Sequence, residues 1–116
     1  MSTKKHTFKS YGMHRTGPTT LASWLMAGQA FSNATGTFHG TPFPVGKGRL
    51  PKEFEDSLNE ADYVVYSYGT PIAWHVPAQG TLRARWIEPN VKYSQTTTAH
   101  QSRLSIALNI AKVWSS

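Results

Sequence analysis

The histidines are the side chains best suited to acid–base or metal chemistry, and they are scattered along the chain: His6, His14, His39, His75 and His100. No two of them stand two or four residues apart, so the sequence contains no pattern of zinc ligands. Cysteine is absent, which excludes a thiolate metal site, a disulfide framework and a cysteine nucleophile. We therefore expect neither a metal ion nor another cofactor.

His100 is the strongest single candidate for chemistry. We expect it one turn inside a C-terminal helix, where the helix dipole makes a protonated imidazole costly. A neutral imidazole at this place could act as a base or a hydrogen-bond acceptor, with Tyr68 or Thr97 as its partner in a small hydrolase or nuclease. The alternative is structural, with the ring packed one turn before Leu104 over the entry to the sheet.

Other catalytic patterns are missing. Ser67, followed by Tyr68 and Gly69, is not the glycine-flanked serine of a nucleophile elbow. Five of the six acidic residues lie between Glu53 and Asp62, where they are expected to form a solvated helix face rather than a pair of catalytic carboxylates. The stretch 46–49 lacks the Lys-Ser/Thr ending of a phosphate-binding loop. We assign no catalytic residue.

Basic residues outnumber acidic ones everywhere except in one short segment, and the formal net charge is +6. Residues 1–52 hold seven Lys and Arg without an acid, and residues 63–116 hold five against Glu88 alone. A basic surface favours polyanions through phosphate contacts and counterion release. Alternatively, the charge only keeps a small domain soluble. If nucleic acid binds, the expected contacts are Lys4, Lys5, Lys9, Arg15, Lys47, Arg49, Arg83 and Arg85.

The elements that would position these side chains include three expected helices. The first, over 18–31, begins with Pro18, because proline lacks the N–H that is unpaired at the first helical position. The second, over 51–61, has an apolar stripe at helical spacing that should face a sheet. The third, over 98–114, begins with Thr98 and Gln101 three residues apart, the spacing of a capping box. Its buried stripe comprises Leu104, Ala107, Leu108 and Ala111.

Three strands are expected to form an antiparallel meander over 63–68, 72–76 and 82–87. Residues 63–68 are β-branched or aromatic almost throughout, as in a buried strand. Ile72, Trp74 and Val76 should share one face, and Leu82, Ala84 and Trp86 should point inward. Weaker strand patterns cover 6–10 and 91–94. Residues 32–49 are rich in Gly and Pro and are predicted to be a long loop with a short strand over 37–39.

Length and composition predict one α+β domain, with three to four strands against about three helices and a mobile basic tail over 1–5. The 116 residues include 14 aromatic ones and are 39% hydrophobic, enough for a packed core. No apolar run approaches the ~20 residues of a spanning helix, and the start of the chain has no signal-peptide pattern. We expect a cytoplasmic protein without membrane contact.

Two segments resemble a family of small uncharacterised proteins that occur in actinobacterial phages and in some archaeal genomes. The first reads YSYGTPIAW over 66–74 and the second reads YSQTTTAHQ over 93–101. The residues of possible functional weight in these motifs are Tyr68, Thr70, Trp74, Tyr93, Thr97, His100 and Gln101. The family has no established activity, so the resemblance implies context alone: a phage accessory protein acting inside a bacterial host.

These observations lead to two hypotheses for function besides the hydrolase. The first is a non-enzymatic protein that binds DNA or RNA through its basic surface. The second is a phage protein that binds and redirects a host protein, with exposed aromatic residues and the loop over 32–49 as its interface. The sequence contains no indication of the oligomeric state.

Overall fold

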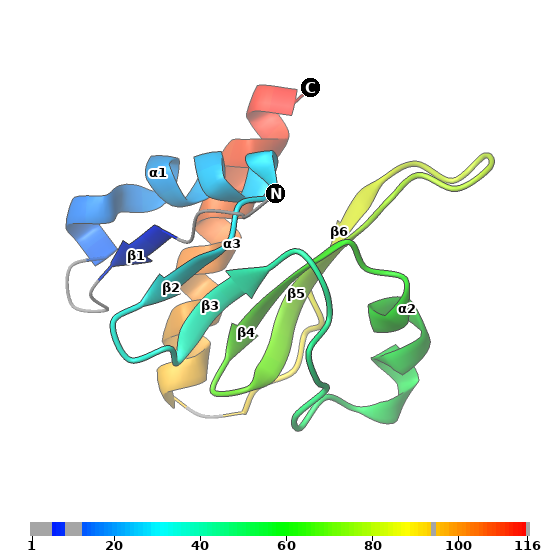
Figure 1. Cartoon of the computed structure of the whole chain (residues 1–116), viewed down its shortest axis with the longest axis horizontal. Coiled ribbons are helices and arrows are strands. Elements are labelled where there is room, and N and C mark those ends of the chain that lie inside the picture. Colours follow the sequence, from blue (N-terminus) through cyan, green and yellow to red (C-terminus); the bar gives the residue numbers. More distant parts are fainter. Residues whose placement is uncertain (1–5, 9–12, 94, 116) are drawn as a thin grey trace.

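The computed structural model describes residues 6–8, 13–93 and 95–115, and they form an α+β fold. Six strands lie in one sheet in the order of the sequence, and helices pack against both of its faces (Figure 1). Strands β2 to β6 are antiparallel, and β1 pairs parallel to β2. The strands are β1 (His6–Phe8), β2 (Phe31–Asn33), β3 (Phe38–Thr41), β4 (Tyr63–Ser67), β5 (Thr70–Val76) and β6 (Arg85–Ile87).

The long helices α1 (Met13–Ala27) and α3 (Gln95–Ser115) cover one face of the sheet. Their apolar stripes meet the inward side chains of β2 to β5 in the larger core cluster, which includes Phe31, Phe38, Val65, Leu104 and Leu108. The stripe predicted for the last helix is confirmed, since all four of its residues are buried. Burial of this apolar area is the main stabilising term of such a layered fold.

A smaller cluster fills the opposite face of the sheet. The chain after β3 crosses this face and ends in the 3-10 turn η2 (Lys52–Phe54) and the short helix α2 (Glu55–Asn59). The helix predicted over 51–61 is therefore divided into two short pieces. Its apolar stripe is nevertheless correct, because Leu50 and Leu58 are buried here against Trp74 and Val76.

A shift in strand register decides which side chains of β5 face which core. Val65 pairs with Ala73 whereas Tyr66 pairs with Pro71, so Ile72 is an extra residue in β5. Such a bulge turns two successive side chains to the same face. Ile72 and Ala73 both join the α1–α3 core, and the expectation that Ile72 shares a face with Trp74 and Val76 is wrong.

The boundaries of the first helix also differ from the prediction. Helix α1 begins at Met13, so Pro18 lies inside it, and it ends at Ala27, where Gly28 adopts a left-handed backbone with φ +66°. Gly28 N and Gln29 N donate to the carbonyls of Leu25 and Trp24, which closes the helix end. Phe31 is consequently free to start β2.

Residues 32–49 are not one loop, because β2 and β3 form a hairpin within them. The Asn33 side chain stabilises this hairpin, since its amide donates to Thr37 Oγ1 (2.9 Å) and its Oδ1 accepts from Phe38 N (3.1 Å). The strand expected over 37–39 is β3, and the irregular part is reduced to 42–49.

The third predicted strand is shorter than expected. Only Arg85–Ile87 pair with β5, and the residues before them form a projecting hairpin arm (Figure 1). Leu82 is 58% exposed and Ala84 is also exposed, so only Trp86 of the three predicted inward residues reaches the core. Residues 91–93 form no strand, and no helix among the described residues is long and apolar enough to cross a membrane.

Candidate functional site

Most of the motif residues come together where the β4–β5 turn meets the start of α3. A shallow polar pocket of about 360 Å³ lies there, and we call it the motif pocket. Seven residues from four separate segments line it: Arg49, Ser67, Tyr68, Thr70, Tyr93, Thr96 and Thr97. The two motifs, about 20 residues apart in the sequence, are thus parts of one site because β4 and β5 run beside α3.

Tyr68 occupies the corner of the β4–β5 turn in a left-handed backbone conformation, with φ +50°. Among the described non-glycine residues only Tyr68 has a positive φ, which costs a side chain of this size about 1 kcal/mol or more. Its N–H donates to Thr37 O (2.7 Å), which holds the turn against β3. Tyr68 is 56% exposed, so a strained backbone presents an aromatic side chain to solvent.

Behind Tyr68, the ring of His100 is part of an aromatic column. His100 stacks on Tyr68 with ring centroids 5.8 Å apart and on Phe38 with centroids 4.7 Å apart. Phe38 in turn contacts Phe31 edge to face. Because the column is anchored in the core, the exposed ring of Tyr68 is held in one orientation.

His100 is 4% exposed and is hydrogen-bonded to Ser67 at the end of β4, with 2.7 Å between Nδ1 and Oγ. The Ser67 hydroxyl also lies 3.3 Å from Thr97 Oγ1, and the imidazole tautomer decides which atom of the Ser67–His100 pair donates. Burial lowers the pKa of His100 below its ordinary value, and the nearby Arg103 charge lowers it further. Both effects favour the neutral form of the imidazole, and burial is the larger of them.

This arrangement favours a structural role for the Ser67–His100 pair. A serine nucleophile needs both a neighbouring base and space for a substrate at its hydroxyl oxygen. Ser67 is only 1% exposed, which leaves little room for a substrate at its oxygen. The pair instead ties β4 to α3 and supports Tyr68 from below.

Arg49 reaches the motif pocket because the 42–49 loop is docked against the β4–β5 turn. Its backbone N–H donates to Thr70 Oγ1 (3.0 Å). Gly48 makes this docking possible, since it has φ +45° and lies so close to Gly69 O and Thr70 that a Cβ atom would overlap them. The pocket lining contains Arg49 and no acid, so its electrostatic potential favours anions.

Tyr93 contributes a hydroxyl with unused hydrogen-bonding capacity. Its Oη is buried and has no hydrogen-bond partner within the described part of the chain. Burial raises the pKa of Tyr93, and the Arg49 charge opposes that rise, which places the guanidinium near this ring. A second, more open depression, lined by Lys92, Tyr93, Gln95 and Thr98, lies beyond Tyr93.

Two motif residues do not line the motif pocket and have other roles. The Gln101 amide donates to Val91 O (2.8 Å), so it fastens the segment before α3 to the helix. The predicted Thr98–Gln101 capping box is wrong, because α3 already begins at Gln95 and Thr98 lies inside it. Trp74 is fully buried on the opposite face of the sheet, where its Nε1–H donates to Ser57 Oγ (2.9 Å).

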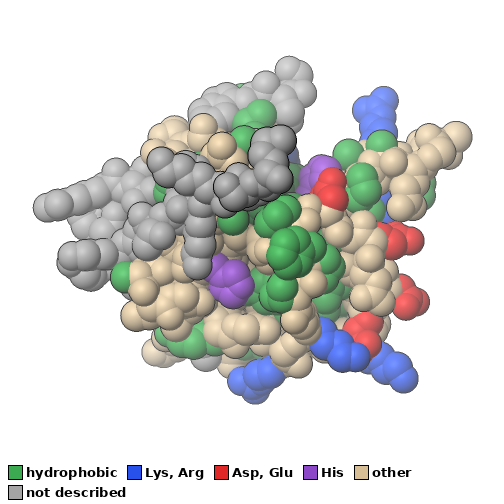
Figure 2. Space-filling view, in the orientation of Figure 1, with side chains coloured by type: hydrophobic (Ala, Val, Ile, Leu, Met, Phe, Trp, Pro, Cys, Tyr) green, Lys and Arg blue, Asp and Glu red, His purple; other side chains and the backbone are tan. Residues whose placement is uncertain are grey.

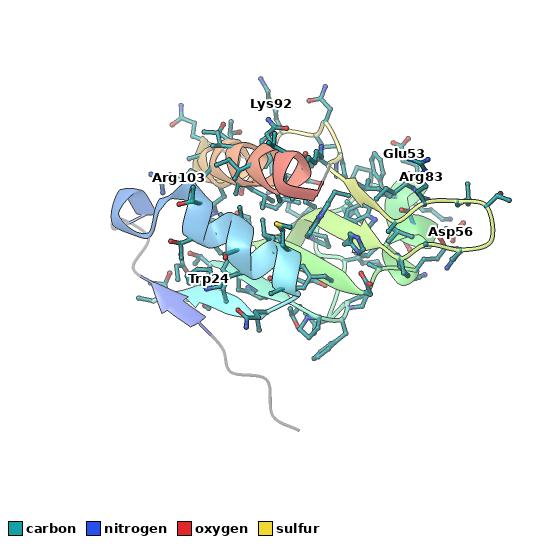
Figure 3. The ribbon with its side chains drawn as sticks, turned by 90° about the horizontal axis from the view of Figure 1, so that it is seen from above. Trp24, Glu53, Asp56, Arg83, Lys92 and Arg103 are labelled. Carbon is teal, nitrogen blue, oxygen red and sulfur yellow. The ribbon has the colours of Figure 1, made fainter. Side chains whose placement is uncertain are left out.

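Of the basic residues proposed as nucleic-acid contacts, the four whose side chains the structure describes do not gather on one face. Lys47 pairs with Glu55 (2.8 Å), and Arg83 and Arg85 lie on the hairpin arm at the other end of β5 from the motif pocket. Figure 3 shows Arg83 on the side of Glu53 and Asp56, far from Arg103. Only Arg49 joins the motif residues. Lys4, Lys5, Lys9 and the Arg15 side chain lie outside the described residues.

Sequence reasoning missed Ser67 and Thr96 as site residues. Ser67 had a usable signal, because Tyr63, Val65 and Ser67 alternate on the face of β4 that the last helix covers. No sequence pattern indicated Thr96 as a site residue, since the predicted helix began two residues after it. Within the described residues there is no group of three or more histidine and acidic side chains that could hold a metal ion.

Comparisons with known proteins give a family and no function. No curated protein and no solved structure matches the chain. One family model, described as a family of unknown function (DUF8033), matches residues 5–112. That range includes both motifs and nearly the whole fold, so the chain belongs to the DUF8033 family.

Proposed function

We propose that this protein binds single-stranded nucleic acid at the motif pocket. The observation that carries the proposal is the exposed Tyr68 ring, held rigidly by His100 beside Arg49 and a cluster of hydroxyl groups. Aromatic platforms next to cationic side chains are the usual means of binding single strands, because each base offers a stacking face and each phosphate a charge. This mode does not require the basic residues that lie elsewhere on the chain.

In the proposed mode an unstacked base packs on the exposed face of Tyr68. The strained backbone and the aromatic column fix this ring before binding, so little conformational entropy is lost on association. A flanking phosphate lies against the Arg49 guanidinium, within reach of the Thr96 hydroxyl. These contacts do not discriminate strongly between sequences.

The proposal is tested by fluorescence anisotropy with labelled single-stranded DNA and RNA oligonucleotides. Stacking of one base contributes about 1–3 kcal/mol, so Tyr68→Ala should weaken binding at least about fivefold. Arg49→Ala should weaken it about three- to tenfold. The matched controls are Leu82→Ala, which removes an equally exposed apolar side chain, and Arg83→Ala, which removes an exposed arginine from the hairpin arm.

Both controls should bind like the unmodified protein. If no oligonucleotide binds at low salt, or if Arg83→Ala and Arg49→Ala lose affinity equally, the motif pocket is not a nucleic-acid site. Duplex DNA of the same length serves as a competitor, and it should compete poorly because its bases are already stacked.

The biological context belongs to the same proposal. The two motifs resemble proteins of actinobacterial phages and archaea, so we propose a phage accessory protein that acts in the bacterial cytoplasm. A protein of this kind would meet phage or host single strands during replication or transcription. Expression early after infection and recovery of the protein with cross-linked nucleic acid would support this context.

A host-protein partner is the second candidate, and the 42–49 loop favours it. Phe43 and Val45 are both exposed there, although a monomer gains nothing from placing such side chains in water. Figure 2 shows hydrophobic side chains gathered near the middle of this face of the molecule. Recovery of one stoichiometric protein from nuclease-treated host lysate, lost with a Phe43→Ser and Val45→Ser double variant, would favour this candidate.

A small hydrolase has only the 2.7 Å contact of Ser67 and His100 in its favour. A fluorophosphonate probe modifies serine residues that a neighbouring base activates. Labelling that disappears in Ser67→Ala would support hydrolysis, and an unlabelled protein would leave the pair with its structural role.

A further inference from the structure

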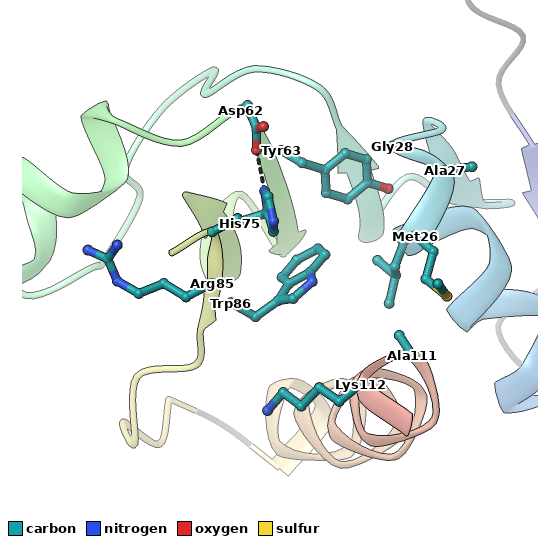
Figure 4. A pocket seen from close by; sticks show the side chains of 12 residues that line it. Met26, Ala27, Gly28, Asp62, Tyr63, His75, Arg85, Trp86, Ala111 and Lys112 are labelled. Atoms are coloured by element: carbon teal, nitrogen blue, oxygen red, sulfur yellow. Dashed lines mark hydrogen bonds and ion pairs between the residues drawn. The ribbon is translucent and has the colours of Figure 1, made fainter. Parts of the chain in front are cut away.

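A cleft of about 720 Å³ lies where the ends of α1 and α3 meet β5 and β6, and we call it the helix-end cleft. It is at the other end of β5 from the motif pocket, because His75 lines the one and Thr70 lines the other. Its volume is within the range of small-molecule sites. Figure 4 shows its walls, with Met26 and Ala111 from the two helices on one side and His75 and Trp86 from the strands on the other.

Three aromatic rings in a row form the strand side of the helix-end cleft. The strand register places Tyr63 opposite His75 and His75 opposite Trp86, so their side chains share the face of the sheet that α1 and α3 cover. The Trp86 ring stands at 74° to Tyr63 and at 64° to His75, with centroids 5.9 and 5.3 Å away. Aromatic rings set at steep angles around one space are the means by which proteins surround a quaternary ammonium group.

A carboxylate stands beside this aromatic row. Asp62 Oδ1 lies 2.7 Å from His75 Nδ1, and this contact orients the imidazole ring (Figure 4). A carboxylate has about four acceptor sites, so one N–H leaves most of them unused. The Asp62 side chain is 51% exposed and lines the cleft, which leaves its negative charge within reach of a ligand.

The end of α1 adds to the negative potential of the cleft. Ala27 and Gly28 line the cleft at the carboxyl end of this helix, where the helix dipole is negative. The last turn of α1 carries no basic side chain that would offset the dipole. Backbone N–H groups of Gly28 and Gln29 satisfy only two of the last carbonyls. A cation in the cleft is therefore favoured from the helix side as well.

The two basic residues of the lining are directed elsewhere. Arg85 pairs with Val76, so its side chain lies on the opposite face of the sheet from Trp86. Figure 4 shows the Arg85 side chain extending away from the cleft. Lys112 is engaged by Glu88, at 3.9 Å. The carboxylate is therefore the charge in contact with the aromatic row, and its sign favours a cation.

The helix side of the cleft is apolar, with Leu25, Met26 and Ala111 as its lining. A bare ammonium group would exchange its hydration here for few hydrogen-bond acceptors, which costs free energy. Methyl groups on the nitrogen have no such cost, because they pack against apolar and aromatic surfaces while the charge stays over the indole ring.

We propose that the helix-end cleft binds an organic cation of the trimethylammonium class. The methyl groups lie between Trp86 and the Leu25–Met26 wall, and the Asp62 carboxylate balances the charge. This site goes beyond the proposed nucleic-acid function and is independent of it, since the two pockets share no lining residue.

Choline and dimethylbutanol, in which carbon replaces the charged nitrogen, test the proposal because they differ in charge and hardly in shape. Binding is followed by NMR at about pH 8, where imidazole groups are largely neutral. Choline should shift the Trp86 indole N–H signal saturably, and dimethylbutanol should bind at least about tenfold more weakly. Equal affinity for the two compounds, or no saturable shift, would overturn the proposal.

Substitutions of Trp86 separate the aromatic contribution from apolar packing. Trp86→Leu keeps an apolar side chain without a ring, so choline affinity, followed at the Gly28 amide, should fall about tenfold while dimethylbutanol affinity stays within about threefold. Trp86→Phe keeps a smaller ring and should be intermediate, and it serves as the test if the leucine variant folds poorly. Proportional losses for both compounds would indicate a merely apolar cleft and refute the site.

Two acids of the same acidic segment give a matched pair of variants. Asp62→Asn keeps an oxygen that accepts from His75 and removes the charge, so choline affinity should fall about threefold. Asp56→Asn removes an exposed charge outside the cleft lining and should have no effect. Equal losses in the two variants would show a non-specific charge effect and count against the site.

Lys112→Met gives the sign of the ligand's charge. Because this substitution removes a positive charge from the lining, choline should bind at least as tightly as to the unmodified protein. Weaker binding would mean that the lysine holds the ligand, which contradicts a cation site.

The trimethylammonium group could belong to a free small molecule or to a methylated lysine side chain, and two ligands distinguish these sources. Tighter binding of choline than of an acetylated trimethyllysine amide would identify a small molecule, and the reverse would identify a modified protein. Both results support the site. Ethanolamine and unmethylated lysine amide should bind at least about tenfold more weakly than their methylated counterparts, and equal binding would overturn the proposal.

The two proposed sites can fail separately. Tyr68→Ala and Arg49→Ala should leave choline affinity unchanged, and Trp86→Leu should leave oligonucleotide affinity unchanged.

Discussion

At the scale of single residues, Tyr68 combines an unfavourable backbone with an exposed aromatic ring. A residue in the left-handed region is normally glycine or asparagine, because a Cβ atom collides with the following carbonyl. Strain of this kind persists when the surrounding structure supports it, and here Thr37 and His100 provide that support. The cost is consistent with selection for the ring's position rather than for stability.

Two substitutions separate the backbone strain from the ring. Tyr68→Ala and Tyr68→Gly both remove the aromatic surface, but only glycine adopts φ +50° without strain. We expect the glycine variant to be more stable than the alanine variant by about 1 kcal/mol in urea unfolding, and both to lose oligonucleotide binding equally. Equal stabilities would show that the turn relaxes and that Tyr68 is not strained.

His100 should make the stability of the protein depend on pH. Its pKa is lowered in the folded state, chiefly by burial, so the unfolded chain binds more protons below about pH 6.5. The stabilisation is complete above the unfolded pKa and is lost as the pH falls from there toward the lowered folded pKa. The slope in that window approaches about 1.4 kcal/mol per pH unit.

The His100→Gln variant isolates this effect. Urea unfolding is measured between pH 7.5 and 5, and the loss of stability on acidification should be clearly smaller in the variant. The comparison of slopes, rather than of absolute stabilities, removes the cost of the lost stacking on Phe38. Parallel pH profiles would mean that His100 is not the titrating group.

At the scale of elements, the motif pocket depends on the docking of the 42–49 loop against the β4–β5 turn. Tyr66 Oη holds the middle of this loop, because it accepts from Val45 N (2.7 Å) and donates to Gly46 O (3.0 Å). Gly48 and Thr70 hold its end and bring Arg49 to the pocket. Neither motif includes this loop, yet the site is incomplete without it.

Gly48→Ala should disrupt this docking. Its Cβ atom would overlap backbone atoms of Gly69 and Thr70, and its φ is positive, so we expect a loss of about 2 kcal/mol or more in unfolding free energy. Arg49 should be displaced, with a loss of oligonucleotide affinity comparable to that of Arg49→Ala. Gly46→Ala is the control, since a Cβ atom at Gly46 would have nothing within 4 Å, and it should change neither quantity.

At the scale of the whole molecule, the net charge is +6, and the basic side chains that the structure describes do not form one cationic face. Glu53, Asp56 and Arg83 lie toward one end of the view in Figure 3, and Arg103 lies toward the other. Charges separated by more than the Debye length of about 8–10 Å contribute little at physiological salt. Binding at the motif pocket should therefore involve few phosphates.

The salt dependence of oligonucleotide binding measures the number of phosphates that the protein contacts. We expect the logarithm of oligonucleotide affinity to fall with the logarithm of salt concentration with a slope of about −1 to −3, far below that of a protein with an extended basic face. Arg49→Ala should reduce the slope by about one and Arg83→Ala should not change it. A slope steeper than about −5, reduced by every arginine variant, would favour a diffuse cationic surface.

The helices and strands with a regular spacing of apolar residues could be predicted from the sequence, because that spacing involves only residues close together in the chain. The apolar stripe of 104–111 was identified correctly, and so was the antiparallel order of β4, β5 and β6. The strand predicted over 63–68 is β4, which ends one residue earlier at Ser67. By contrast, β2 was hidden in a glycine-rich stretch, because three buried residues carry no periodicity that a sequence pattern detects.

The composition and periodicity of this chain determined a layered α+β core, the sequence order of its main elements and a motif that joins a turn to a helix. The tertiary structure alone decided which residues form the site. Ser67, Arg49 and Tyr93 meet because loop docking and a one-residue bulge set distances between segments far apart in the chain. Local propensities contain no information on such distances, since they arise from the packing of whole elements.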